Sequence, residues 1–185
     1  MREAARRLAL MWATPLVLVT AILVLVAVPA PPASAEETAV ASGKRCAKLA
    51  NALAQKTRAG RRNAPNVPGG DVATHAVCHD FTGDGRRDVA FAIASGGTGG
   101  AFEWAVFRRR PRTSDPAAKR FRKVAERRSG THTSMTRRRR LLVVRNPIYR
   151  ADDPNCCPTG GERLRSYRVK ANRVVLVDRR RVPAE

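Results

Sequence analysis

The stretch Asp80-Phe81-Thr82-Gly83-Asp84-Gly85-Arg86-Arg87-Asp88, followed by the apolar run 89–94, decides how this chain folds. Two glycines close together allow the backbone to turn tightly, and an unbroken apolar run bounded by turn residues is typical of a buried strand. We therefore expect residues 80–88 to form a loop that leads into the centre of a β-sheet. Its three aspartates also make this loop the strongest chemical feature of the sequence.

The loop supports two hypotheses. Calcium takes roughly six to eight oxygen ligands, and the loop offers oxygens from Asp80, Thr82, Asp84 and Asp88 together with the carbonyl of Arg86. The alternative is a hairpin turn of the Asx or Asp-Gly type, which needs no metal. Arginines inside the loop and the positive charge of the whole chain act against a bound cation. We expect a turn in either case, and a weak structural Ca²⁺ site as the sharper hypothesis.

The charge of the chain is strongly positive. The 185 residues include 36 Lys and Arg against 15 Asp and Glu, which gives a net charge of +21. Such a chain attracts anions: acidic cell-wall polymers, anionic membrane surfaces or nucleic acid. The candidate anion-binding residues are the run Arg137, Arg138, Arg139 and Arg140. The alternative is that this run protects an edge strand from pairing with other chains. Aromatic residues make up only 5% of the chain, which argues against a stacking platform for single-stranded nucleic acid.

The N-terminal region predicts export. Three arginines at positions 2, 6 and 7 precede the apolar run 16–28, and Ala33-Ser34-Ala35 follows a proline-rich stretch. A basic start, an apolar middle and an Ala-x-Ala site define a secretory signal peptide, here residues 1–35. The alternative is an uncleaved membrane anchor, because the apolar character is long enough to span a bilayer. We expect a secreted protein in which residues 36–43 form a flexible lead-in and 44–185 form a single domain.

The patterns after residue 43 predict one helix and a series of strands. Apolar residues recur at helical spacing over 44–59 and place Cys46 on the buried face. Strands are expected at 72–79, 89–95, 102–108, 120–127, 131–136, 140–145, 164–169 and 174–177, joined by short turns. Consecutive strands with short connections indicate antiparallel pairing. The expected fold class is α+β: a mostly antiparallel β-sheet with one N-terminal helix packed on it, stapled by disulfides.

The four cysteines, Cys46, Cys78, Cys156 and Cys157, are an even number in an exported chain, which predicts two disulfides. Adjacent cysteines do not pair readily, because a disulfide usually separates its Cα atoms by ~4.4–6.8 Å. We therefore expect the adjacent pair to bond to the two distant cysteines, one each, in either of the two possible combinations.

Catalysis has little support in the sequence. The chain contains three histidines, and none is accompanied by a nucleophile motif such as G-x-S-x-G. His75 and His79 share one face of the predicted strand while Cys78 points to the other, so the three do not form a metal site. Adjacent cysteines also lack the C-x-x-C spacing of a redox site. We expect a protein that is not an enzyme.

Two resemblances accompany these inferences. Residues 80–88 resemble the calcium loop of FG-GAP and VCBS repeats, D-x-[DN]-x-D-G-x-x-D, although Thr82 replaces the usual Asn or Asp. An EF-hand is excluded, because its twelfth position requires Glu and Phe91 stands there.

Residues 80–177 resemble the LppP/LprE family of exported bacterial lipoproteins. The order of parts carries this likeness: the D-x-T-G-D-G loop, an apolar strand, a glycine-rich turn with an aromatic strand, the element Asp153-Pro154-Asn155-Cys156-Cys157-Pro158, and a final hairpin. The resemblance implies export and a small α+β domain, and it implies no reaction. The lipidated cysteine of that family is missing here.

The functional expectation is therefore a secreted, non-enzymatic protein with a weak structural calcium loop. The alternative is a basic surface protein that binds anionic cell-wall polymers, a membrane surface or nucleic acid through its arginine clusters.

Overall fold

The computed structural model describes residues 35–111 and 120–184. Within them the chain forms two helices, two short 3-10 turns and eight strands. In chain order these are α1 (Ala35–Ala54), α2 (Arg58–Asn63), η1 (Ala64–Asn66), η2 (Pro68–Gly70), β1 (Ala73–His79), β2 (Asp88–Ala94), β3 (Ala101–Arg109), β4 (Phe121–Arg128), β5 (Ser134–Arg138), β6 (Leu141–Pro147), β7 (Glu162–Val169) and β8 (Val174–Val182). The predicted α+β class is confirmed. Of the predicted signal peptide, 1–35, all but the last residue lies outside the described residues.

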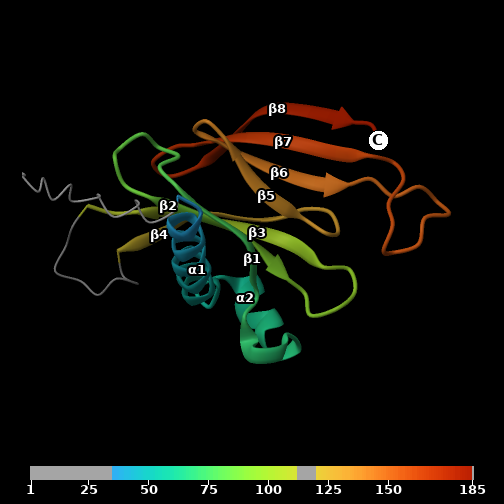
Figure 1. Cartoon of the computed structure of the whole chain (residues 1–185), viewed down its shortest axis with the longest axis horizontal. Helices are drawn as coiled ribbons and strands as arrows, with labels where there is room; N and C mark the ends of the chain where they lie inside the picture. Colours follow the sequence, from blue (N-terminus) through green and yellow to red (C-terminus); the bar gives the residue numbers. More distant parts are fainter. Residues whose placement is uncertain (1–34, 112–119, 185) are drawn as a thin grey trace, which may run out of the picture. The chain divides into compact units, whose positions relative to one another are not determined.

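The strands form two antiparallel sheets of four strands each, ordered β1-β2-β3-β4 and β5-β6-β7-β8. The sequence predicted one sheet, and this part of the prediction is corrected. Every pair of neighbours within a sheet is also consecutive in the chain, as short turns favour. The first sheet lies between the helices and the second sheet (Figure 1), which gives three layers.

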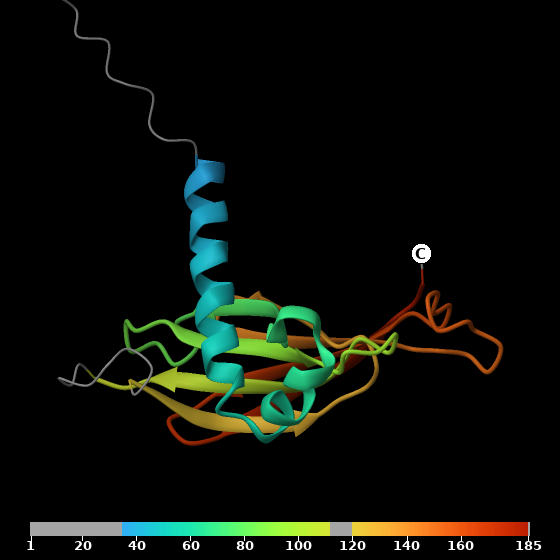
Figure 2. The ribbon, with the colours of Figure 1, turned by 90° about the horizontal axis from the view of Figure 1, so that it is seen from below.

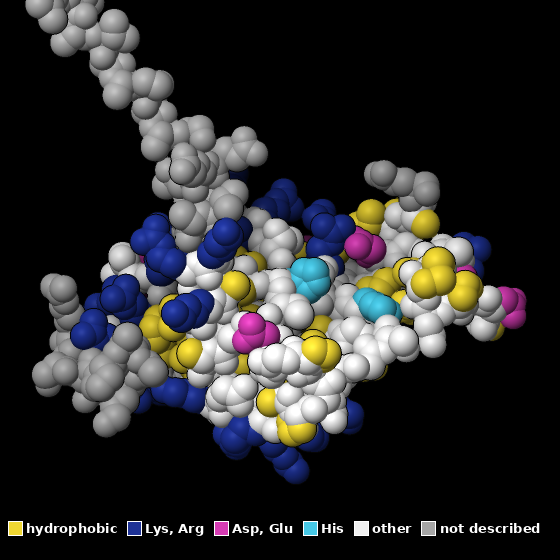
Figure 3. Space-filling view, turned by 60° about the horizontal axis from the view of Figure 1, so that its bottom comes forward, with side chains coloured by type: hydrophobic (Ala, Val, Ile, Leu, Met, Phe, Trp, Pro, Cys, Tyr) yellow, Lys and Arg dark blue, Asp and Glu magenta, His cyan; other side chains and the backbone are white. Residues whose placement is uncertain are grey.

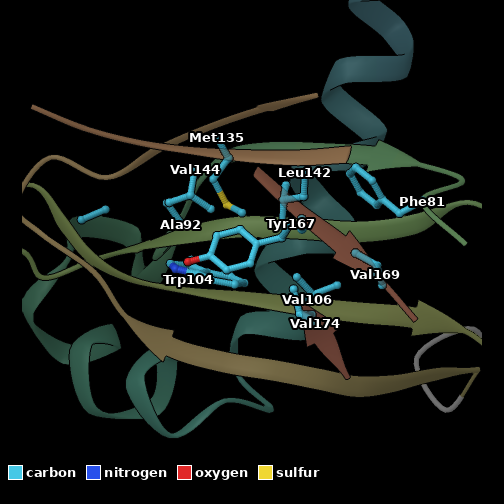
Figure 4. Packing of buried hydrophobic residues seen from close by; sticks show 12 residues of the cluster. Phe81, Ala92, Trp104, Val106, Met135, Leu142, Val144, Tyr167, Val169 and Val174 are labelled. Atoms are coloured by element: carbon cyan, nitrogen blue, oxygen red, sulfur yellow. The ribbon is translucent and has the colours of Figure 1, made fainter. Parts of the chain in front are cut away.

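The larger hydrophobic cluster lies between the two sheets. Ala92, Trp104 and Val106 come from the first sheet, and Leu142, Val144 and Tyr167 are among the residues from the second. The rings of Trp104 and Tyr167 lie 5.0 Å apart between their centroids, and the side chains of both sheets meet in Figure 4. Sheets stack in this way when each has one apolar face.

A second cluster lies between the helices and the opposite face of the first sheet. Ala50, Leu53 and Ala54 of α1 contact a layer that includes Phe91 and Phe107, and Figure 2 shows α1 and α2 over this sheet. Strand β2 is therefore covered on both faces, and all of its residues except Ala94 are buried. This explains why its sequence is continuously apolar rather than alternating.

The helical region differs from the prediction at both ends. Helix α1 already includes the segment 36–43 that was expected to be a flexible lead-in. It ends at Ala54 because Thr57 starts a new helix: the Thr57 hydroxyl donates to the carbonyl of Ala54 and accepts from the N–H of Gly60, 2.8 Å in each case. A threonine in this position is a favourable N-cap. The predicted single helix 44–59 is therefore two helices.

The disulfide pairing differs from the prediction. Cys46 of α1 bonds to Cys78 of β1, with 5.8 Å between their Cα atoms. Cys156 bonds to its neighbour Cys157 in the segment between β6 and β7. The expected bonds from the adjacent pair to the distant cysteines are therefore wrong. Cys46 lies on the face of α1 that packs on β1, so its nearest cysteine is Cys78. The adjacent pair lies in a connection of the other sheet, and its two cysteines bond to each other.

Candidate functional site: an aspartate loop and a basic cleft

The loop 80–87 joins β1 to β2, as both hypotheses for this loop required. Asp80 organises it. One carboxylate oxygen, Oδ1, accepts hydrogen bonds from the N–H groups of Gly83 (2.7 Å) and Asp84 (3.1 Å), and the other, Oδ2, accepts from Gly85 (2.8 Å). Partial desolvation raises the pKa of Asp80, but the three N–H groups outweigh it and the pKa lies below its usual value. Asp80 thus fixes the turn as an ionised acceptor.

Asp84 neutralises arginines. Its Oδ2 lies 2.7 Å from the guanidinium of Arg86 and 2.8 Å from that of Arg108 on β3, and its Oδ1 accepts from the N–H of Arg86 at 3.0 Å. Desolvation raises the pKa of Asp84, and these hydrogen bonds outweigh it, so the pKa is lowered. The ion pair with Arg108 ties the loop to the sheet behind it.

Asp88 is completely buried at the start of β2. Its Oδ1 accepts from the N–H of Arg109 at 3.1 Å, while its Oδ2 has no hydrogen-bond partner in the described part of the chain. Burial raises the pKa of Asp88 to about 6; the N–H groups of Arg109 and Phe81 act to lower it, and the negative charges of Asp84 and Asp80 raise it further.

The predicted calcium ligands therefore divide between different partners. Asp80 faces backbone N–H groups, Asp84 faces two arginines, and the hydroxyl of Thr82 lies 3.4 Å from Asp80 Oδ1. Within residues 35–111 and 120–184, no three acidic, histidine or cysteine side chains come together as a metal-binding group. Calcium binding by Asp80, Thr82, Asp84, Arg86 and Asp88 stays a prediction.

The turn between β5 and β6 packs against this loop. A Cβ atom added to Gly83 would lie only 2.7 Å from Nη1 of Arg140, and Gly83 has a positive φ of 80°. A side chain at position 83 would thus collide with the guanidinium and strain the backbone. The structure brings together two features that the sequence presented as separate, the aspartate loop and the arginine run.

Arg139 and Arg140 line a cleft of about 770 Å³ beside the loop, which we call the basic cleft. Its other cations are Arg108 of β3, Arg168 of β7 and Lys170 of the turn after β7, and its apolar lining includes Phe81, Leu141 and Val169. Arg108 is paired with Asp84. In the described part of the chain, the remaining four cations form no ion pair.

The arginine run does not act as one patch. Arg137 and Arg138 belong to β5, where successive side chains point to opposite faces, and neither lines the cleft. The anion-binding residues predicted from the sequence did not include Arg108, Arg168 or Lys170. These residues come from separate strands and a turn, and only the packing of the two sheets brings them together.

No protein-family model, curated protein or solved structure matches this chain. Among the described residues, no helix has the length and apolar character needed to cross a membrane.

Proposed function

We propose that this protein is an exported, non-enzymatic protein that binds anionic polymers of the cell surface through the basic cleft. One observation carries the proposal. Arg139, Arg140, Arg168 and Lys170 converge on one cavity from two connections and a strand, and no carboxylate in the described residues pairs with them. Unpaired cations that share a concave surface concentrate the positive potential and attract polyanions.

The charge of the second sheet extends this attraction beyond the cleft. Residues 134–182 contain 14 Lys and Arg against 4 Asp and Glu. Figure 3 shows the other side of the molecule, which carries the helices, and Lys and Arg side chains are also more frequent there than acidic ones. An extended polymer bound in the cleft would therefore meet further positive charge along its length, which favours a polymer over a single small anion.

Export is the second part of the proposal. The Cys46–Cys78 bond is compatible with an oxidising compartment outside the cytoplasm. The basic, apolar and Ala-Ser-Ala segments of the N-terminal sequence support the same location, as does the resemblance to the LppP/LprE lipoproteins.

The test is the affinity for a labelled polyglutamate oligomer at low salt, measured by fluorescence anisotropy. The double substitution Arg139→Gln with Arg140→Gln should weaken binding by about tenfold or more, because each guanidinium–carboxylate contact contributes about 1.5–3 kcal/mol when desolvated. Arg58→Gln with Arg61→Gln removes the same charge from exposed positions on α2 and should change the affinity less than threefold. If both double variants weakened polyglutamate binding equally, the interaction would depend only on net charge, and a role for the cleft would be refuted.

A second candidate function, the structural calcium site, is favoured by one observation: Asp88 Oδ2 is buried without a partner. A cation there would compensate the buried charge, provided that Asp84 released Arg86 and Arg108. A site with a Kd near 1 mM would stabilise the fold by about 1.4 kcal/mol at 10 mM calcium. The wild type should then show a rise in Tm that Asp84→Ala loses and that the exposed control Asp71→Ala keeps. Absence of heat and of any Tm shift at millimolar calcium would remove this candidate.

A further inference from the structure

The hairpin of β7 and β8 carries four arginines on one face. The register places Arg163 directly opposite Arg181 and Arg165 directly opposite Arg179. Directly paired residues share a face, and so do residues two apart on one strand. The four side chains, which we call the arginine quartet, therefore share one face of the hairpin. Figure 1 shows the hairpin of β7 and β8 and the C-terminus beside the end of β8. With Arg180 the quartet lines a cavity of about 350 Å³.

The quartet has no acidic partner among the described residues. The two acidic side chains of this hairpin are directed elsewhere: Glu162 forms an ion pair with Arg145, and Asp178 lies opposite Ser166. Within the part of the chain that the structure describes, Arg165 alone of the four has a polar side-chain contact, donating to Asn146 Oδ1 at 3.3 Å. Like charges directly opposite each other in a sheet destabilise it. Two such pairs in succession leave a local excess of positive charge that a bound anion would relieve.

We propose that the arginine quartet binds a phosphate group. Each guanidinium presents a planar fork of donors that matches two oxygens of an oxyanion. A tetrahedral phosphate carries about −1.5 to −2 charges near neutral pH and directs its oxygens to several sides, so it can accept from both strands at once. A single carboxylate has two coplanar oxygens and serves one fork, and it carries half the charge.

This site is separate from the basic cleft. The cleft lies at the turn end of the hairpin, where it includes Arg168 and Lys170, and the quartet lies toward the other end. Arg165 of the quartet and Arg168 of the cleft are three residues apart on β7, or about 10 Å at the rise of a strand. The phosphate site can therefore be present whether or not the cleft binds a polymer.

The source of the phosphate group is either a free anion or a phosphate within a chain. Calorimetry with inorganic phosphate and, separately, with inorganic polyphosphate distinguishes the two, in a buffer without other oxyanions. Binding of inorganic phosphate assigns a free-anion site, and binding of polyphosphate alone assigns a chain-borne group. Either result supports the proposal only if it depends on the quartet.

That dependence is tested with Arg165→Gln combined with Arg179→Gln, which removes one cross-strand pair. The variant should weaken phosphate-group binding by about tenfold or more, and its Tm without anion should be equal to or higher than that of the wild type, because repulsion is relieved. The matched variant Arg139→Gln with Arg140→Gln loses the same charge at the cleft and should keep its affinity for inorganic phosphate within about twofold. Binding of neither probe to the wild type, or equal weakening in both variants, would overturn the proposal.

Discussion

The disulfide between Cys46 and Cys78 predicts a specific asymmetry in stability. The bond closes a loop with a sequence separation of 32. In the chain-entropy description, a cross-link of that length stabilises the folded state by about 3.7 kcal/mol through the restriction of the unfolded chain. The Cys156–Cys157 bond joins neighbours in sequence and restricts almost no unfolded conformations. Removal of the first bond should therefore be costly, and removal of the second should cost less than about 1 kcal/mol.

Urea unfolding of two double variants measures this difference. Replacing Cys46 and Cys78 by Ala should lower the midpoint by about 2 M, for a slope near 2 kcal/mol per M. Replacing Cys156 and Cys157 by Ala should move it by less than about 0.5 M. Chemical reduction of the second variant should reproduce the loss seen in the first, which separates the bond from the packing of Cys46. Equal losses in the two variants would refute the pairing, because bonds between the adjacent pair and the distant cysteines would be broken in both.

Three further predictions concern the aspartate loop. The pKa of Asp88 is raised from 3.8 to about 6 on folding. Between pH 3.8 and pH 6 the folded state therefore keeps the carboxyl of Asp88 protonated, whereas the unfolded state loses this proton. The wild type should therefore lose about 2.5 kcal/mol of unfolding free energy, relative to Asp88→Asn, as the pH rises from about 4 to 7; parallel pH curves for the two proteins would contradict this. Asp80→Ala leaves the three loop N–H groups without their acceptor and should lower the unfolding free energy in urea by about 1–3 kcal/mol. Gly83→Ala and Gly85→Ala place a side chain at a similar positive φ and should each cost about 1–2 kcal/mol. Only Gly83→Ala displaces Arg140, so only that variant should also weaken polyglutamate binding.

The elements of the fold could be predicted from local patterns, but their partners could not. The nearly continuous apolar run in 89–95 predicts a central strand, and the structure buries β2 on both faces. The division into two sheets was not visible, because strand patterns do not state where pairing stops. Pairing stops at the connection from β4 to β5. There the hydroxyl of Ser129 donates to Asn146 Oδ1, and the amide of Asn146 donates to the hydroxyl of Thr133. Thr133 and Asn146 are buried. Nothing in the sequence indicated that these two residues would hold the connection between the two sheets.

The candidate site could likewise be predicted only in part: its two segments could be found in the sequence, but their contact could not. The aspartate loop is one continuous stretch of sequence, and so is the run Arg137–Arg140, so each could be identified from the sequence. Their contact through Gly83 and Arg140 depends on how the two sheets pack. The quartet depends on the register of β7 and β8, in which a shift between Ser166 and Tyr167 determines which arginines face each other. A change of one residue in register would direct the arginines of one strand to the opposite face.

The salt dependence of polymer binding tests the central claim most directly. The affinity for polyglutamate is measured from low to moderate salt for the wild type and for Arg139→Gln with Arg140→Gln. If the basic cleft binds the polymer, the affinity of the wild type falls steeply with salt. The slope of log affinity against log salt is smaller by roughly one to two units in the variant, because the two missing arginines no longer release counterions on binding. Identical slopes for the two proteins, or an affinity that does not change with salt, would contradict the proposed function.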